Sequence, residues 1–324
     1  REDIKAIVQI PIIQDTLGLK LFGAKIKHDG HVKNTTLGKD VGGDDKTNYG
    51  FAALWAPTEN FDIKVHYEIM EDKSEQGAYV NRNRVGELAC TITQIGFDPA
   101  NGCEINANDG PDSTESDGLN FSDNDYESTI ITSNYDTDNF LYTYIYTLRD
   151  MDEQNMQDFD GAPAHLLRMN FFNDWKQTSH EFRVTSQFSD KFQFIAGLYD
   201  WETDFDQRWD VFDLFYQLSR LGVPPWGSGR QGAEGYSDVF PWEDDVAGNN
   251  GQSQKTTSTA AFFSGDWYVT DAWTLTAGFR WTEEEKDFVG GASAPGYYPL
   301  RGEPWPGIFN PYFAKQKWTE ITPK

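Results

Sequence analysis

Few residues of this 324-residue chain combine the types and spacing that catalysis or metal binding requires. The five histidines do not have the spacing of metal ligands: His28, His31, His66, His165 and His180. Glu283–Glu285 is a carboxylate run, for which we expect a solvated strand end beside a loop rather than an acid–base pair. No nucleophile elbow or phosphate-binding loop occurs. The residues predict no catalytic site, no metal site, no cofactor and no enzymatic activity.

Aromatic side chains offer a different chemistry, the capture of a ligand. We expect a long loop from Asp206 to Gln254 that carries several of them: Trp209, Trp226, Tyr236, Phe240 and Trp242. Exposed aromatic residues on long loops mark binding surfaces, so these five are candidate cargo contacts. The alternative is packing within the loop, around a short helix that the apolar spacing predicts over Asp210–Leu221.

The elements that position these residues are strands. Ser179–Glu202 reads as two alternating strands joined at Ser189-Asp190. The strands run for about ten residues or more, the length that a tilted strand needs to cross a bilayer. The same unit of strand, tight turn, strand and long loop recurs, and aromatic residues stand beside the turns. The other expected strands are Asp3–Ile13, Thr16–Lys27, Lys46–Ala56, Phe61–Met70, Ser128–Tyr135, Phe140–Arg149, Lys255–Val269, Trp273–Phe288 and Trp318–Lys324.

Composition and alternation narrow the class of protein. The net charge of −25 argues against nucleic acid as a partner, because such binding requires Lys and Arg on phosphate. No apolar run is long enough for a transmembrane helix, whereas a transmembrane β-barrel needs only alternate apolar residues. We therefore expect Ile63, Val65 and Tyr67 to meet lipid. The polar positions Lys64, His66, Glu68 and Arg280 would face a lumen. The polar segment Glu71–Glu127 is expected to be a solvated loop.

Three segments resemble hairpins of TonB-dependent outer-membrane receptors: SHEFRVTSQFSDKFQFIAGLYDWE, TAAFFSGDWYVTDAWTLTAGFRWTEEEKDF and VQIPIIQDTLGLKLFGAKIKHDGHVKN. KWTEITPK resembles the start of a strand of the same family that carries a Thr-Pro pair. The resemblance implies an all-β fold, an antiparallel, meandering transmembrane β-barrel of about 22 strands with a plug in its lumen. Short turns would be periplasmic and long loops extracellular.

This sequence departs from the family pattern, since residues 1–324 show about eleven strand segments and neither a plug nor a TonB box. We therefore expect a barrel-domain fragment, roughly the first half of the barrel. The resemblance places the protein in the bacterial outer membrane, in contact with lipid and lipopolysaccharide. It implies active uptake of a small-molecule or chelate cargo, such as a ferric siderophore. The TonB complex would act through the missing plug and TonB box.

Two alternatives stay open at this point, a passive outer-membrane porin and a secreted β-rich carbohydrate-binding protein. Export also bears on Cys90 and Cys103, the only two cysteines. Thiols within reach of each other tend to pair in an oxidising compartment, and the Gly, Pro and Asn residues between them let the chain double back. A metal pair and two free thiols are the competing interpretations. We expect a disulfide that shapes one extracellular loop.

Overall fold

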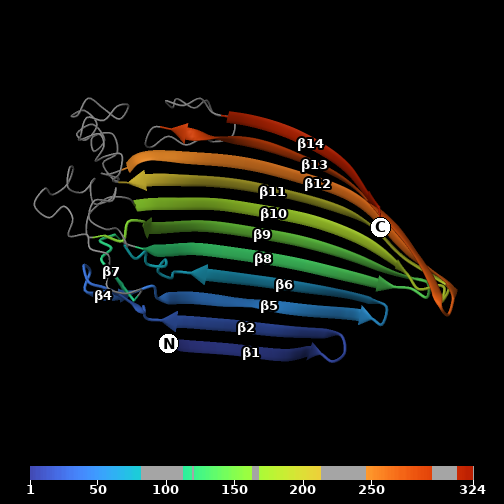
Figure 1. Cartoon of the computed structure of the whole chain (residues 1–324). Coiled ribbons are helices and arrows are strands. Elements are labelled where there is room, and N and C mark those ends of the chain that lie inside the picture. The colour runs from blue at the N-terminus through green and yellow to red at the C-terminus, as the bar shows by residue number, and fades with distance from the viewer. Residues whose placement is uncertain (82–111, 119, 163–167, 213–245, 294–311, 324) are drawn as a thin grey trace, which may run out of the picture.

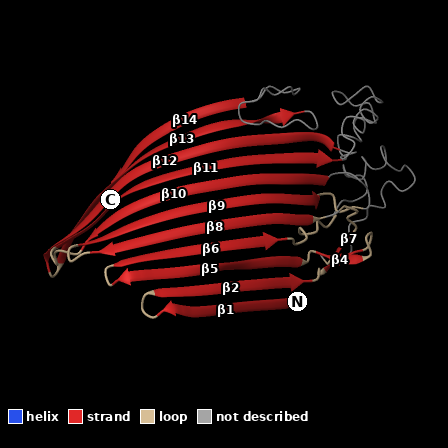
Figure 2. Ribbon diagram, turned by 180° about the vertical axis from the view of Figure 1, so that it is seen from behind, coloured by secondary structure: helices blue, strands red, loops and turns tan. Residues whose placement is uncertain are grey.

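The computed structural model describes residues 1–81, 112–118, 120–162, 168–212, 246–293 and 312–323. In these ranges all regular structure is strand. No helix in them is long and apolar enough to span a membrane. Eleven strands form one antiparallel sheet in the order β1-β2-β5-β6-β8-β9-β10-β11-β12-β13-β14. Each strand of this sheet pairs with the next strand of the same sheet along the chain, which confirms the predicted meander. The strands lie side by side in one curved layer (Figures 1 and 2).

The strands lengthen from 12 residues in β6 to 25 residues in β12, and the last strand, β14, again has 12. The sheet consists of β1 (Glu2–Ile13), β2 (Leu17–His28), β5 (Asp44–Thr58), β6 (Phe61–Asp72), β8 (Phe121–Asp136), β9 (Phe140–Asp158), β10 (Arg168–Ser186), β11 (Phe192–Phe212), β12 (Val246–Thr270), β13 (Trp273–Ser293) and β14 (Tyr312–Pro323). A second, small sheet joins β3 (Val32–Asn34) to β4 (Lys39–Val41) and to β7 (Ser113–Thr114). It lies at the end opposite the tight turns (Figure 1).

The later strands extend well beyond the predicted bounds. The expected loop Asp206–Gln254 is wrong at both ends, because β11 continues to Phe212 and β12 begins at Val246. The helix expected over Asp210–Leu221 is likewise contradicted at its start, and its remainder lies outside the described residues. The physical reason is that both faces of these strand ends carry polar side chains, so the apolar alternation that marks a strand in the sequence stops early.

The two faces of the sheet differ in chemistry, and we name them after two residues of β6. The Val65 face carries large apolar side chains that are exposed: Leu21, Tyr49, Tyr144, Phe182, Leu198, Leu275 and Phe279. Leu198, for example, is 61% exposed. Among the described residues the buried apolar side chains are Val41, Ala162, Ala260 and Val289. Such a sheet has almost no hydrophobic core, so its stability requires an apolar medium against the Val65 face.

Aromatic contacts join the strands close to the tight turns. Trp55 and Phe61 meet edge to face across the turn between β5 and β6, with ring centroids 6.4 Å apart. Phe194 of β11 stacks on Phe263 of β12 at 5.7 Å, and Phe263 stacks on Phe279 of β13 at 6.2 Å. These rings lie on the Val65 face and form the border of its apolar band. The arrangement is typical of the aromatic girdle at a membrane interface.

Residues near the other end form a packed cap around Asp158, whose side chain is fully buried. Its carboxylate accepts hydrogen bonds from the Ser116 hydroxyl at 2.6 Å and from the backbone N–H groups of Gly118, Asp160 and Gly161 at 3.0–3.2 Å. Asn34 of β3 donates to the Ser116 carbonyl at 2.8 Å. The prediction of a solvated loop over Glu71–Glu127 is therefore wrong for its described ends, because β6 continues to Asp72, β8 begins at Phe121 and Ser116 between them is fully buried.

The carboxylate run Glu283–Glu285 is also not at a strand end. It lies in the middle of β13, and its side chains alternate between the two faces. Lys317 and Lys315 of β14 form ion pairs with Glu283 and Glu285, each at 2.6 Å, on the Val65 face. Glu284, on the opposite face, pairs with Lys286 at 3.2 Å. The pairs of Glu283 and Glu285 therefore connect β13 with β14, whereas the pair of Glu284 lies within β13.

Candidate functional site: the His66 face and its aromatic pocket

The four side chains predicted to face a lumen share one face of the sheet. Lys64, His66 and Glu68 alternate along β6 with the apolar residues of the Val65 face. The cross-strand register connects them with Arg280 of β13. The partners run from Arg280 through Phe262, Gly197, Arg183, Thr143 and Asn134 to Asp62, two residues before Lys64. Directly opposed residues project to the same side, so Arg280 belongs to the His66 face.

Local contacts hold these side chains in place. The His66 ring stacks on Phe22 at 5.5 Å, and its Nε2 lies 3.3 Å from a Glu68 carboxylate oxygen. Arg280 donates from Nε to the Thr282 hydroxyl at 3.1 Å, and its guanidinium lies 5.7 Å from the Tyr199 ring centroid. Among the described residues no group of three His, Cys, Asp or Glu side chains could hold a metal ion. The described side chains of the His66 face can therefore bind a ligand through hydrogen bonds and ring contacts.

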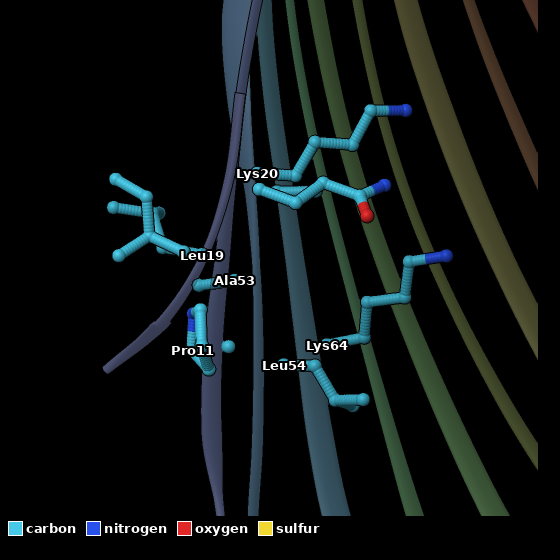
Figure 3. Close-up of a pocket in the computed structure, with 10 residues that line it drawn as sticks. Pro11, Leu19, Lys20, Ala53, Leu54 and Lys64 are labelled. Atoms are coloured by element: carbon cyan, nitrogen blue, oxygen red, sulfur yellow. The ribbon is translucent and has the colours of Figure 1, made fainter. Parts of the chain in front are cut away.

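A first cavity on this face lies where the first strands approach their tight turns. Figure 3 shows Lys20 and Lys64 on one side of the sheet and Leu19 on the other. The cavity has a volume of about 440 Å³ and is floored by small residues such as Gly18 and Ala52. Because the two ammonium groups flank an apolar floor, this part of the face can receive an acidic or apolar segment.

A line of hydrogen-bonded amides crosses four strands of the same face, nearer the long connections. Gln252 of β12 donates to Gln207 of β11, and Gln207 donates to Asn173 of β10, both at 2.8 Å. Asn173 in turn donates to the Glu153 carboxylate of β9 at 2.6 Å. We call these four residues the amide ladder. The register places all four directly opposite one another.

Aromatic side chains flank the ladder and form a second cavity at its end. This pocket of about 380 Å³ is lined by Trp209, Gln252, Phe288, Tyr312 and the backbone of three glycines. Phe171 of β10 packs against Trp209 with ring centroids 6.3 Å apart, and Phe288 packs against Tyr312 at 6.2 Å. The pocket combines flat apolar walls with one amide, which is typical of small-molecule sites.

Of the five predicted cargo contacts, Trp209 lies in the wall of this pocket, in β11 instead of a loop. Trp226, Tyr236, Phe240 and Trp242 lie outside the described residues, as do Cys90 and Cys103. Sequence reasoning missed the amide ladder. Its signal is the period-two sequence of aromatic and amide residues in Phe205-Asp206-Gln207-Arg208-Trp209 and Phe171-Phe172-Asn173-Asp174-Trp175.

The Val65 face carries charged side chains beyond its apolar band. Asp125, Asp152, Asp174 and Asp206 stand directly opposite one another on β8, β9, β10 and β11. The pKa of Asp174 is raised, first by the partial loss of water around its carboxyl and then by the neighbouring Asp152. In the next row of the Val65 face, on the side of the apolar band, Lys176 pairs with Asp150 at 3.3 Å. Charged rows of this kind require contact with water, so they mark the limit of the apolar band on the Val65 face.

The sequence of this chain matches a known protein family over most of its length. The family described as TonB dependent receptor-like, beta-barrel matches residues 75–324. This chain belongs to the TonB-dependent receptor family. The resemblance predicted from the hairpins is confirmed, and so is the all-β, antiparallel sheet. Members of this family are outer-membrane receptors and transporters of Gram-negative bacteria, and they are not enzymes. The chain is therefore an outer-membrane protein.

Solved structures share the fold at low sequence identity. The ferric yersiniabactin uptake receptor FyuA from Yersinia pestis aligns with a TM-score of 0.67 at 15% identity, over 99% of this chain and 40% of that one. The siderophore receptor PiuA from Acinetobacter baumannii aligns with a TM-score of 0.62 at 11% identity, over 99% of this chain and 44% of that one. This chain thus spans less than half the length of either receptor. No curated protein sequence matches the chain significantly.

Proposed function

We propose that this protein is a receptor for active, TonB-energised uptake of a scarce solute, such as a ferric siderophore or another large nutrient. The family match over residues 75–324 carries the proposal. The names of FyuA and PiuA as siderophore receptors support the cargo class. The TonB complex would act through a plug and a TonB box, neither of which lies among these residues.

The two faces of the sheet fit this role. In the proposed orientation, Val65 and its apolar neighbours contact lipid, and the charged positions beyond them reach the lipopolysaccharide layer. Lys64, His66, Glu68 and Arg280 line the lumen, where polar side chains can stay hydrated or contact a plug. The tight turns are periplasmic, and the long connections are extracellular. The disulfide between Cys90 and Cys103 remains part of the proposal as a brace of one extracellular connection.

Uptake in cells tests the function. The complete gene is expressed in a Gram-negative host that lacks its own siderophore receptors, with and without functional TonB. Radiolabelled iron is supplied as a panel of ferric siderophores. We expect uptake of at least one complex to require both the protein and TonB, and to stop when the proton gradient is dissipated. Uptake that persists without TonB would instead support the porin alternative.

A further inference from the structure

We propose that the pocket at the end of the amide ladder binds an uncharged ring that has one apolar face and hydroxyl donors on its edge. A sugar ring and a neutral hydroxylated aromatic ring share this chemistry. The inference rests on the proposed function, because it assigns part of the cargo to a named place on the lumen wall. It goes further by predicting that the charged part of any cargo contacts other residues.

The shape of the pocket supports a flat ligand. Trp209 comes from β11, Phe288 from β13 and Tyr312 from β14, so the three rings stand on different strands around a floor of backbone. The floor includes Gly290, which is buried and directly opposite Gln252. A Cβ atom at Gly290 would lie 2.7 Å from Cζ of Phe288. The absence of that side chain lets the Phe288 ring lie across the strand and leaves the cavity open.

The ladder fixes which hydrogen-bonding atom the pocket presents. An ionised carboxylate has no hydrogen to donate, so Asn173 must direct its NH₂ group toward Glu153. The oxygen of Asn173 then accepts from the NH₂ group of Gln207, and the oxygen of Gln207 accepts from the NH₂ group of Gln252. Gln252 therefore uses its NH₂ group to donate a hydrogen bond to Gln207 of β11. The other polar atom of this amide, Oε1, can only accept, and Gln252 lines the pocket. The amide thus offers an acceptor, which selects a ligand with O–H or N–H donors.

The charge of the surrounding wall selects an uncharged ligand. On the His66 face, three successive rows cross β9 to β11 beside the pocket, and their described members are Met151, Trp175 and Phe205; Glu153, Asn173 and Gln207; and Asn155, Phe171 and Trp209. None of them is a cation. Lys286 stands on the same face below Phe288, but it is paired with Glu284. An anionic ring would therefore lose hydration here without gaining a positive partner among the described residues.

Ligand-observed NMR tests the inference directly. The protein is expressed from its complete gene and purified in detergent. Saturation transfer is then measured to three probes: methyl glucoside, catechol, and 3,4-dihydroxybenzoate as the anionic counterpart of catechol. We expect transfer to at least one neutral probe, and which one responds identifies the source of the ring. Transfer to neither neutral probe, or equal transfer to catechol and its carboxylated counterpart, would overturn the inference.

Matched variants assign the signal to the pocket. Trp209→Ala removes an aromatic wall and Gln252→Leu removes a hydrogen bond, and each should weaken binding about tenfold, which corresponds to roughly 1.4 kcal/mol. Trp201→Ala and Gln254→Leu alter the same strands and the same face outside the pocket and should leave binding unchanged. Phe288→Leu is a second pocket variant in case one fails to fold. If all pocket variants bind like the wild type, the assignment is wrong.

Failure of this inference can be told apart from failure of the proposed function. Saturation transfer needs no TonB, so ring binding without TonB-dependent uptake would retain the pocket and remove the transport mechanism. TonB-dependent uptake that is unaffected by Trp209→Ala and Gln252→Leu would retain the transport mechanism and remove the pocket.

Discussion

Asp152 of β9 and Asp174 of β10 stand directly opposite each other on the Val65 face, and Asp206 of β11 continues the row. Partial burial and then the charge of Asp152 raise the pKa of Asp174. The folded state therefore binds this proton more tightly than the unfolded chain does. It follows that this contribution to stability is greatest below the unfolded pKa, about 3.9, and is lost as the pH rises through the folded pKa.

Asp174→Asn should consequently stabilise the folded protein at neutral pH. The gain is expected to be modest, about 0.5 kcal/mol, because the carboxyl group is largely exposed. It should disappear near pH 3, where Asp174 is protonated in both states. Urea titrations in detergent at both pH values, monitored by circular dichroism, measure the effect. Asp190→Asn in the turn before β11 is the matched control. An equal gain at both pH values would contradict the electrostatic explanation.

The assignment of Val65 to lipid and of His66 to the lumen leads to a second prediction. Val65→Arg places a charge on the face that we assign to lipid and should cost roughly 2–4 kcal/mol near the membrane midplane. His66→Arg alters the next residue on the opposite face and should cost much less. The heat-modifiable migration of the membrane-inserted protein compares the two variants. Spin labels at residues 63 and 65 should be shielded from water-soluble quenchers, and labels at 64 and 66 should be reached. The reverse pattern would show that the faces are exchanged.

Gly197 of β11 provides a third prediction, on packing between strands. A Cβ atom there would lie 2.4 Å from Cζ of Phe262 and 2.6 Å from the Phe182 carbonyl oxygen. Gly197→Ala should therefore destabilise the sheet by about 1–3 kcal/mol, as overpacking does. Gly18→Ala is the control, since no atom lies within 4 Å of its added Cβ. Urea midpoints of the two variants should differ. Equal midpoints would mean that the Phe262 ring moves aside at little cost.

Phe61–Asp72 illustrates how much of the fold the sequence predicts. Its apolar residues alternate strictly because one face requires an apolar medium, so the strand, its turn and its two faces all follow from the pattern. The pattern places Lys64 and His66 on one face, and the register confirms that they share it. The order of the strands follows as well, because tight turns impose pairing between neighbours in the chain.

Other features depend on contacts that no local pattern records. The first half of β10 carries Asp174 and Lys176 on the Val65 face, where the sequence pattern of a strand requires apolar residues. The sequence therefore resembles a loop there. The cap depends on Asp158 accepting from Ser116 and Gly118, about forty residues earlier in the chain. The amide ladder requires the register of four strands before its members can be seen as neighbours.

The cysteines give a fourth prediction. Cys90 and Cys103 should be disulfide-bonded in the exported protein, because thiols within reach of each other tend to pair in an oxidising compartment. Closing a loop of this length contributes about 3 kcal/mol in the chain-entropy model. Alkylation of the unfolded protein should label neither cysteine without a reductant and both after reduction. Cys90→Ser should then expose Cys103 to the reagent. Labelling of both thiols without a reductant would refute the bridge.

The last prediction concerns the connection between β11 and β12, which carries Trp226, Tyr236, Phe240 and Trp242. The connection joins strand ends close to the pocket, since Trp209 pairs with Asn250 three residues below the end of β11. Deleting residues 224–242 removes these four aromatic residues and leaves both strands intact. We expect TonB-dependent uptake to fall at least about tenfold, because aromatic anchors dominate binding energy at recognition surfaces. Heat-modifiable migration should stay unchanged, since the strand ladder is retained. Replacing the segment with Gly and Ser residues of equal length separates the loss of side chains from the shortening of the connection. Uptake that survives both changes would remove these residues from the cargo site and leave Trp209 in the wall as the one remaining member of the predicted set.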